Sequence, residues 1–488
     1  MKGVFILALL AILAAPIAAS AGWVSEGTDP FNWPYHPNGG LGTYYDGQNN
    51  SGPVIAMPTT MPVNNQQIQA AGAAIYSMGG QGSSVYWEYF DGVSTYTKTY
   101  FGNREAHLSK YALGGTPGTG TWTSALGSDD TLIDNTPANP RLWYYQAVGL
   151  CGFNNGQNDR TPDETLHSLG TGGPAAGAVA DIDGDHNVEL VWWGGYPRWG
   201  NPGDAYDPDT NYWSKITTAP NFEGGRGAQV GSKFYWINHY KIGLPPDEEY
   251  FDSYWVLDLG DPASWAAATE MTWVEAIENY SVGWRSPGGS DVLITRTGVT
   301  YNYQDMTAKT VTAFTNNPDI GASPEMVVWH DWLVVIQESD RGSGTVWAYD
   351  LTQGAGGTWT DTGVACPSTE DGSSATVYMN TVFWTVQGRA AADAGVLFSI
   401  TTTDLGLSRT LGDIDDNNVV DGLDLTAVLT AWDTVPGDAL WNPRADLDNN
   451  QIIDGLDLTE VISNWTPTAA ASPEPAKPGK RLGNVRKK

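Results

Sequence analysis

The sequence predicts an all-β fold, a β-propeller, followed by a small α-helical domain at the C-terminus. The chain of 488 residues contains 58 Gly, 22 Trp and 23 Tyr, and this composition is typical of short strands joined by tight turns. Strand-like segments recur at a regular distance through the middle of the chain. Near the C-terminus an acidic segment occurs twice, and each copy leads into a short amphipathic helix.

The middle of the chain repeats a unit in which a strand, a turn and a tryptophan follow one another. Leu257, Tyr303 and Tyr349 occupy matching positions, each 46 residues after the last. A strand that ends in two glycines also occurs twice, at Ile75–Gly80 and at Leu190–Gly195. A period of about 40–50 residues, with several strands in each unit, is typical of propeller blades.

The paired glycines and the later Tyr and Trp resemble kelch-type repeats, and Gly225–Ile237 resembles the start of such a blade. The resemblance implies a six- or seven-bladed propeller over residues 22–410. Because a blade buries its faces only against neighbouring blades, the ring must close or be capped. We expect residues 22–66 to supply a closing strand. A β-sandwich with fortuitous repeats is the alternative.

Residues 411–465 contain two copies of a calcium-type loop, 33 residues apart. In an EF-hand loop, oxygen donors at positions 1, 3, 5, 7, 9 and 12 surround one ion, and position 7 contributes its backbone carbonyl. The first copy supplies Asp413, Asp415, Asn417, Val419, Asp421 and Asp424. The second copy supplies Asp446, Asp448, Asn450, Ile452, Asp454 and Asp457. We therefore expect two bound Ca²⁺.

The helix that follows each loop has apolar residues at helical spacing, so the two helices can pack together. They are Leu425, Val428, Leu429 and Trp432 in the first, and Leu458, Val461, Ile462 and Trp465 in the second. The duplication resembles the dockerin family. The resemblance implies that residues 411–465 dock onto a cohesin domain of another protein. It also implies partner contacts near the start of each helix, at Gly422, Leu423, Gly455 and Leu456.

Position 6 of both C-terminal loops departs from the common pattern. Asn418 and Gln451 stand where glycine is preferred, because the chain turns sharply there. The departure leaves the ligands unchanged and bears on affinity. The alternative interpretation of residues 411–465 is a calcium-dependent structural cap for the propeller, with no cohesin partner.

A third acidic loop lies within the propeller sequence. Its oxygen donors alternate along nine residues: Asp181, Asp183, Asp185, Asn187 and Glu189. Four carboxylates packed so closely would repel one another without a cation. The loop resembles the calcium loops of FG-GAP propeller repeats, with His186 as an exposed loop residue where glycine is more usual. We expect one structural Ca²⁺ here, and a solvated acidic turn is the alternative.

Aromatic residues that follow this loop are candidates for a ligand platform, since flat rings stack on sugar faces: Trp192, Trp193, Tyr196 and Trp199. One of the two adjacent tryptophans is expected in the blade core instead. We expect the propeller to bind a polysaccharide, a cell-surface ligand or a protein. Because dockerins in other proteins often accompany polysaccharide-degrading enzymes, the resemblance also implies an alternative, a glycoside hydrolase or polysaccharide lyase. The 55 acidic residues do not single out a catalytic pair.

Charge and the chain ends indicate where the protein acts. A net charge of −31 argues against a nucleic-acid partner, which needs a basic surface. Residues 1–21 are typical of a bacterial-type signal peptide, with Lys2, an apolar run and a small-residue cleavage site. We expect a secreted, extracellular protein without a transmembrane anchor. Residues 466–488 are expected to form a disordered basic tail, and pairing of Cys151 with Cys366 stays open.

Overall fold

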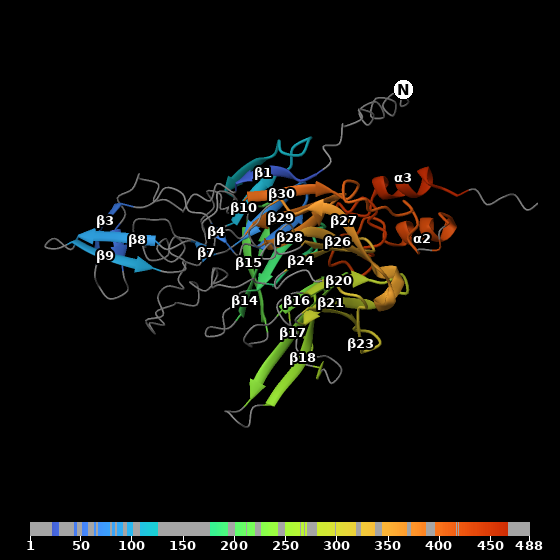
Figure 1. Ribbon diagram of the computed structural model, residues 1–488, viewed down its shortest axis with the longest axis horizontal. Helices are drawn as coiled ribbons and strands as arrows, with labels where there is room; N and C mark the ends of the chain where they lie inside the picture. Colours follow the sequence, from blue (N-terminus) through green and yellow to red (C-terminus); the bar gives the residue numbers. More distant parts are fainter. Residues whose placement is uncertain are drawn as a thin grey trace, which may run out of the picture.

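The computed structural model describes residues 22–466 with gaps, the longest at 29–42, 125–175 and 271–280. Six four-stranded antiparallel sheets form the main body of the protein (Figure 1), and their inner strands line a common channel. The innermost strand of each sheet lies beside the innermost strands of two neighbouring sheets, and these contacts close a ring. The predicted all-β propeller is therefore confirmed, with six blades, and the β-sandwich alternative is wrong.

The blades follow one another along the chain, each from its inner to its outer strand. The first three are β5 (Gln67–Ala71), β6 (Ala74–Met78), β10 (Leu108–Ala112) and β11 (Thr121–Ser124); β12 (Ala176–Ala180), β13 (Glu189–Trp193), β14 (Asn201–Asp207) and β15 (Tyr212–Ala219); and β16 (Arg226–Val230), β17 (Lys233–Ile242), β18 (Glu249–Asp258) and β19 (Thr269–Glu270).

The remaining three blades complete the ring. They are β20 (Ser281–Arg285), β21 (Asp291–Thr297), β22 (Thr300–Asp305) and β23 (Thr310–Ala313); β24 (Glu325–Trp329), β25 (Trp332–Ile336), β26 (Thr345–Asp350) and β27 (Trp359–Ala365); and β28 (Gly372–Tyr378), β29 (Thr381–Val386), β30 (Val396–Thr401) and β1 (Val24–Thr28). The residues with 46-residue spacing, Leu257, Tyr303 and Tyr349, all lie on the third strand of a blade.

The N-terminal strand β1 closes the ring, as expected for residues 22–66. It pairs with β30 and so becomes the outer strand of the last blade. Glu26 on β1 is buried, and its carboxylate accepts hydrogen bonds from the hydroxyls of Tyr111 and Ser399. Tyr111 belongs to the first blade and Ser399 to the last. One carboxylate therefore joins both sides of the closure.

Further strands and short helices lie outside the six blades. A separate sheet consists of β2 (Thr43–Tyr45), β3 (Ser51–Ala56), β8 (Val85–Phe90) and β9 (Thr95–Tyr100), and β4 (Val63–Asn64) pairs with β7 (Gln81–Gly82). A 3₁₀ helix, η4 (Leu351–Gly356), connects β26 to β27. Strands β7, β8 and β9 are an insertion between the second and third strands of the first blade (Figure 1).

The hydrophobic core lies between neighbouring blades. Trp193 of β13 is fully buried, and its ring centroid lies 4.5 Å from that of Phe234 on β17. Trp236 and Leu257 of the third blade belong to the same cluster. Alternate residues of a strand point to the same face, so aromatic residues at every second position fill the space between two blades.

The C-terminal unit, residues 411–466, contains two helices, α2 (Gly422–Thr430) and α3 (Gly455–Ser463). Its small core draws equally on both halves, with Val428 of α2 and Val461 of α3 both fully buried. The expected apolar faces were partly wrong, because Leu429, Trp432, Ile462 and Trp465 are 41–57% exposed. Helices of only nine residues cover a narrow stripe of core, and the tryptophans lie beyond the helix ends.

The C-terminal unit lies against one end of the propeller channel. It contacts the turns that join the inner strand of a blade to its second strand, at Asp181, Asp331 and Met379. Among the described residues, no helix is long and apolar enough to cross a membrane. The expected signal peptide, the basic tail beyond Thr466, and Cys151 lie outside the described residues.

Candidate calcium sites

The two C-terminal loops each gather three carboxylates around one point. Carboxylate oxygens of the residues at loop positions 1, 3 and 12 lie within 4.8 Å of one another. They are Asp413, Asp415 and Asp424 in the first loop, and Asp446, Asp448 and Asp457 in the second. Both position-12 residues are fully buried. Burying clustered carboxylates is costly unless a cation or hydrogen bonds compensate.

The position-12 aspartates close their loops in the same way. Asp424 Oδ1 accepts a hydrogen bond from the backbone N–H of Ile414 at 2.7 Å, and Asp457 Oδ1 accepts one from Leu447 N–H at 2.6 Å. Their Oδ2 atoms accept from the N–H of the helix N-cap residues, Asp421 and Asp454, at 2.8 Å. One aspartate thus fixes both the end of the loop and the start of the helix.

The predicted donors at positions 5, 7 and 9 line the same loops. Side-chain oxygens of Asn417 and Asn450 accept hydrogen bonds from the backbone N–H of Val419 and Ile452 at 2.8 Å. Asp421 and Asp454 instead cap α2 and α3, accepting from Leu423 N–H at 2.8 Å and Leu456 N–H at 2.7 Å. Position 9 of an EF-hand often contacts its ion through water, so this placement fits the expected ligand set.

Burial and mutual repulsion disfavour the charged form of two carboxylates in the second loop, Asp446 and Asp448. Burial raises the pKa of Asp446 well above its ordinary value, and the nearby charge of Asp457 adds to the shift. The same two causes raise the pKa of Asp448 to about 6. A divalent cation at the centre of the cluster would reverse these effects, because opposite charge favours the ionised carboxylate. The donor set, hard oxygens only, suits Ca²⁺.

The loop between β12 and β13 forms a third cluster. Oxygens of Asp181, Asp183 and Glu189 lie within 4.8 Å of one another. Glu189 is only 2% exposed. Its Oε2 accepts from Ile182 N–H at 2.7 Å, while its Oε1 has no hydrogen-bond partner among the described residues. Burial raises the pKa of Glu189 to about 8. A cation bound between Glu189, Asp181 and Asp183 would give this buried oxygen the partner that it lacks.

Glu189, at loop position 9, makes the same backbone hydrogen bond as the position-12 aspartates of the C-terminal loops. In all three loops, a carboxylate accepts the backbone N–H of the residue at position 2: Ile182, Ile414 or Leu447. Glutamate has a longer side chain than aspartate, and it makes this bond from a position three residues earlier in the loop. The other predicted donors, Asp185 and Asn187, hydrogen-bond to each other at the loop surface. The sequence pattern alone missed this equivalence.

Comparisons with known proteins assign no family to the chain. No protein-family model and no curated protein matches it. One similar solved structure, YjhT, shares 14% identity over 43% of this chain and 71% of its own, with a TM-score of 0.31. TolB from Acinetobacter baumannii shares 10% identity over 69% of this chain and 78% of its own, also at 0.31. The assignment of six blades rests on the sheet order of this chain.

The proposed aromatic platform is only partly described. Trp193 is core, as expected for one of the adjacent tryptophans, and its Nε1 donates to the Thr217 carbonyl at 3.1 Å. The side chain of Trp192, and all of Tyr196 and Trp199, lie outside the described residues. A sugar-binding shelf at these positions therefore stays a prediction.

The predicted partner-binding residues at the helix starts are exposed. Leu423 is 63% exposed and Leu456 is 56% exposed, with the propeller in place. Gly422 and Gly455, which precede them, are also exposed. Among the described residues, most of the exposed large apolar side chains belong to the C-terminal unit. The partner contacts expected at these residues stay a prediction.

The propeller channel contains a cavity of about 450 Å³ beneath the C-terminal unit. The inner strands of all six blades line it. On the side of the C-terminal unit its lining includes Arg409, Trp441, Arg444 and Gln451. This volume falls within the range of small-molecule sites. Sequence reasoning missed the cavity because its lining comes from every blade at once.

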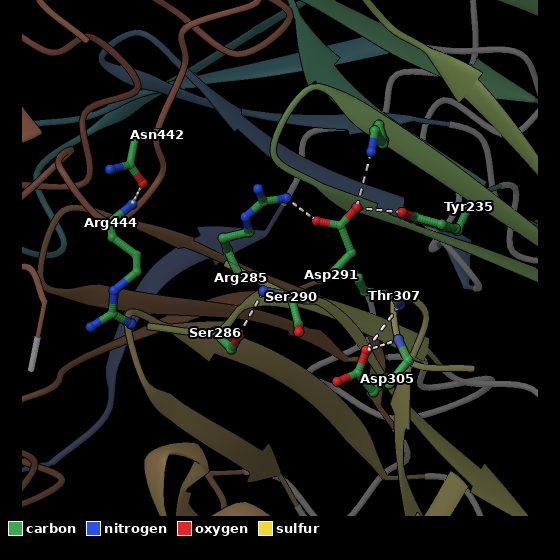
Figure 2. Close-up of polar contacts among 11 residues, drawn as sticks. Tyr235, Arg285, Ser286, Ser290, Asp291, Asp305, Thr307, Asn442 and Arg444 are labelled. Carbon is green, nitrogen blue, oxygen red and sulfur yellow. Dashed lines mark hydrogen bonds and ion pairs between the residues drawn. The ribbon is translucent and has the colours of Figure 1, made fainter. Parts of the chain in front are cut away.

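A polar cluster between the third and fourth blades also escaped sequence analysis. Figure 2 shows Asp291 at the start of β21 between Arg285 and Tyr235, and both donate to its carboxylate. Lys233 Nζ lies 3.4 Å from the same group. Asp291 is 3% exposed. Its oxygens are already engaged, so the cluster ties adjacent blades together and does not offer the two available carboxylates that glycoside hydrolysis requires.

Proposed function

We propose that this protein is a secreted calcium-binding protein that docks onto a cohesin domain through its C-terminal unit. Two Ca²⁺ would occupy the C-terminal loops and a third the loop at Asp181–Glu189. The six-bladed propeller would then present a glycan or protein ligand site. The resemblance of residues 411–465 to dockerins supplies the partner class, and the exposed, duplicated surface of the unit supports it.

The observation that carries the proposal is an exposed surface that occurs twice. Residues 33 positions apart match in kind and in exposure: Leu423 with Leu456, Thr426 with Thr459, Leu429 with Ile462, and Trp432 with Trp465. We call these eight residues the duplicated face. Since α2 and α3 begin with the same capping box, each half offers a similar set of side chains. A partner could therefore engage either half.

The duplicated face stays accessible while the C-terminal unit covers the channel. The exposure of Leu423 and Leu456 is that of the whole chain, with the propeller present. Docking to a cohesin and contact with the propeller use different sides of the unit. Trp432 and Trp465 would supply large apolar contact area, which interfaces favour.

Calorimetric calcium titration and cohesin binding by the full chain test this proposal. We expect three calcium sites and cohesin binding that chelation abolishes. Leu423→Asp or Leu456→Asp alone should weaken binding less than threefold, because the other half remains, whereas the double substitution should abolish it. Val299→Asp, at an exposed apolar residue of the propeller, is the control. Failure of the unaltered chain to bind any of a panel of cohesins would overturn the partner assignment.

The ligand of the propeller is tested separately. Glycan-array binding by the full chain, run beside an activity screen on polysaccharides, distinguishes a binding module from a glycoside hydrolase or lyase. The 450 Å³ cavity favours a small ligand or a chain end over a flat protein surface. Turnover of any glycan would establish the enzymatic alternative instead.

A further inference from the structure

The two described position-6 residues that replace glycine cross the boundary between the propeller and the C-terminal unit. His186 and Gln451 both adopt the left-handed backbone conformation, with φ of 69° and 75°. Glycine enters this region freely, whereas other residues are strained there. Glycine would therefore adopt the backbone conformation at both positions more easily than His186 and Gln451 do. Both side chains have a contact across the boundary.

The two contacts run in opposite directions. Gln451, in the C-terminal unit, donates from Nε2 to the carbonyl of Ala70 on β5 at 2.7 Å. His186, in the propeller loop, has its Nδ1 3.7 Å from a carboxylate oxygen of Asp438 in the C-terminal unit. A glycine at either position would leave the calcium ligands in place and remove the contact. The position-6 side chains thus connect two calcium-type loops to the opposite unit.

The backbone of the same loops also takes part in the interface. The N–H of Asp181, loop position 1, donates to the Pro436 carbonyl at 2.6 Å. The N–H of Met379, in the turn between β28 and β29, donates to the carbonyl of Asn449, loop position 4, at 3.1 Å. Both bonds use backbone atoms of the loops, so they depend on the wrapped conformation, in which the loop carboxylates are gathered around one point.

Close packing leaves no room for a side chain at one edge of this interface. A Cβ atom at Gly437 would lie 2.5 Å from the Asp181 carbonyl oxygen, and one at Gly260 would lie 2.4 Å from the Gly437 carbonyl oxygen. Real Cβ atoms do not approach so closely. The segment around Gly437 therefore sits directly on the second and third blades.

The remaining loop is linked through Arg444. Its Nε donates to the carbonyl of Ile414, position 2 of the first C-terminal loop, at 2.7 Å. Its Nη1 forms an ion pair with Asp331 in the turn between β24 and β25. Two of the three calcium-type loops therefore contact the opposite unit directly, and the first C-terminal loop is connected to it through Arg444. These contacts reach blades 1, 2, 5 and 6.

We infer that the C-terminal unit is a calcium-locked cap over one end of the propeller channel. Two of the loops hold it directly, through Gln451 and His186, and the first C-terminal loop positions Arg444, which holds Asp331. The inference rests on the proposed calcium binding and goes beyond it, since it makes access to the 450 Å³ cavity from this end depend on calcium. With the loops loaded, their wrapped backbone presents these contacts together. Without calcium the clustered carboxylates repel, the loops lose that conformation, and the cap leaves the channel.

Hydrogen exchange of the Met379 amide in the full chain tests the lock, because this amide is covered by the cap but belongs to no calcium loop. We expect it to exchange at least tenfold faster in chelator than in calcium. Gln451→Gly should keep three calcium sites by calorimetry, since glycine suits loop position 6, and still speed exchange at Met379. Unchanged protection in this variant, or protection that ignores chelation, would overturn the inference.

A second substitution acts outside the loops. Gly437→Ala places a Cβ against Asp181 and should also speed exchange at Met379, at the other edge of the cap, whereas Gly422→Ala, whose Cβ meets open space, should not. Equal exchange in these two variants would contradict the cap. Failure of calorimetry to detect calcium would instead refute the proposed function, so the two failures are distinguishable.

Discussion

Arg444 of the C-terminal unit forms an ion pair with Asp331 of the fifth blade, and both side chains are largely shielded from water, at 11% and 16% exposure. Asp331 also accepts a hydrogen bond from Trp284 Nε1 at 3.0 Å. Removing one member of a shielded pair leaves the other without a partner, and this costs more than losing an exposed pair.

We predict that Arg444→Gln lowers the free energy of unfolding of the whole chain by about 2 kcal/mol. The loss arises from the unpaired Asp331 carboxylate and from the Ile414 carbonyl, which loses its donor. Denaturant unfolding in saturating calcium measures it. Lys309→Gln, at an exposed cation, is the control and should change stability by less than about 0.5 kcal/mol. Adding Asp331→Asn to Arg444→Gln should recover part of the loss, and a purely additive double variant would contradict the coupling.

The closure of the ring makes a second prediction. Glu26→Ala removes the acceptor for the hydroxyls of Tyr111 and Ser399 and for the Gly118 N–H. Leaving buried donors unpaired costs about 1–3 kcal/mol each, so we expect the substitution to lower stability by at least about 2 kcal/mol. Thermal unfolding followed by near-ultraviolet circular dichroism measures it. Tyr111→Phe should cost less, because Glu26 keeps its other two donors. An equal cost for both variants would contradict the role of Glu26.

Glu189→Gln should have opposite effects with and without calcium. In calcium the variant should lose the ion of the propeller loop and melt at a lower temperature than the parent. In chelator it should melt at a higher temperature. Burial raises the pKa of Glu189 to about 8, so the parent must take up a proton on folding at neutral pH or bury a charge beside Asp181 and Asp183, and glutamine does neither. Scanning calorimetry under both conditions measures the change of sign. A variant less stable than the parent in both would indicate that Glu189 serves packing rather than a cation.

The His330 side chain predicts a pH dependence. Its Nε2 is buried, and burial together with Arg409 and Arg444 lowers the pKa of His330 well below its ordinary value. The neighbouring Asp331 is engaged by Arg444. The unfolded chain takes up a proton near pH 6.5 and the folded chain does not, so the contribution of neutral His330 is complete above pH 6.5 and lost below it.

We therefore compare the parent with His330→Asn between pH 8 and pH 5.5. Asparagine tolerates the positive φ of 51° at this position. The stability difference between the two proteins should shift against the parent by up to about 1.4 kcal/mol per pH unit below pH 6.5. A difference that stays constant with pH would show that His330 does not titrate with folding.

Periodic features of the fold were predictable from the sequence, whereas contacts between distant segments were not. Leu257, Tyr303 and Tyr349 repeat because each blade needs the same third strand. The blade count stayed at six or seven because Tyr111 and Tyr206, on the third strands of adjacent blades, are 95 residues apart, which is room for one further unit. The spacing of oxygen donors in the calcium-type loops is a local pattern, so it could be recognised from the sequence. Glu189 closing its loop from position 9, and Gln451 reaching Ala70, depend on tertiary structure, and no neighbouring residue signals them.

The pairing of β1 with β30 also sets the order in which the molecule can assemble. Val24 pairs with Ser399, so the earliest described strand must wait until nearly the whole ring exists. Pairing over such a distance along the chain slows folding. Until then β30 presents an unpaired edge, which is a template for a strand from any other copy of the chain. A second molecule could donate its own β1 to that edge, so crowded refolding should yield exchanged dimers and short chains of molecules linked by their first strands.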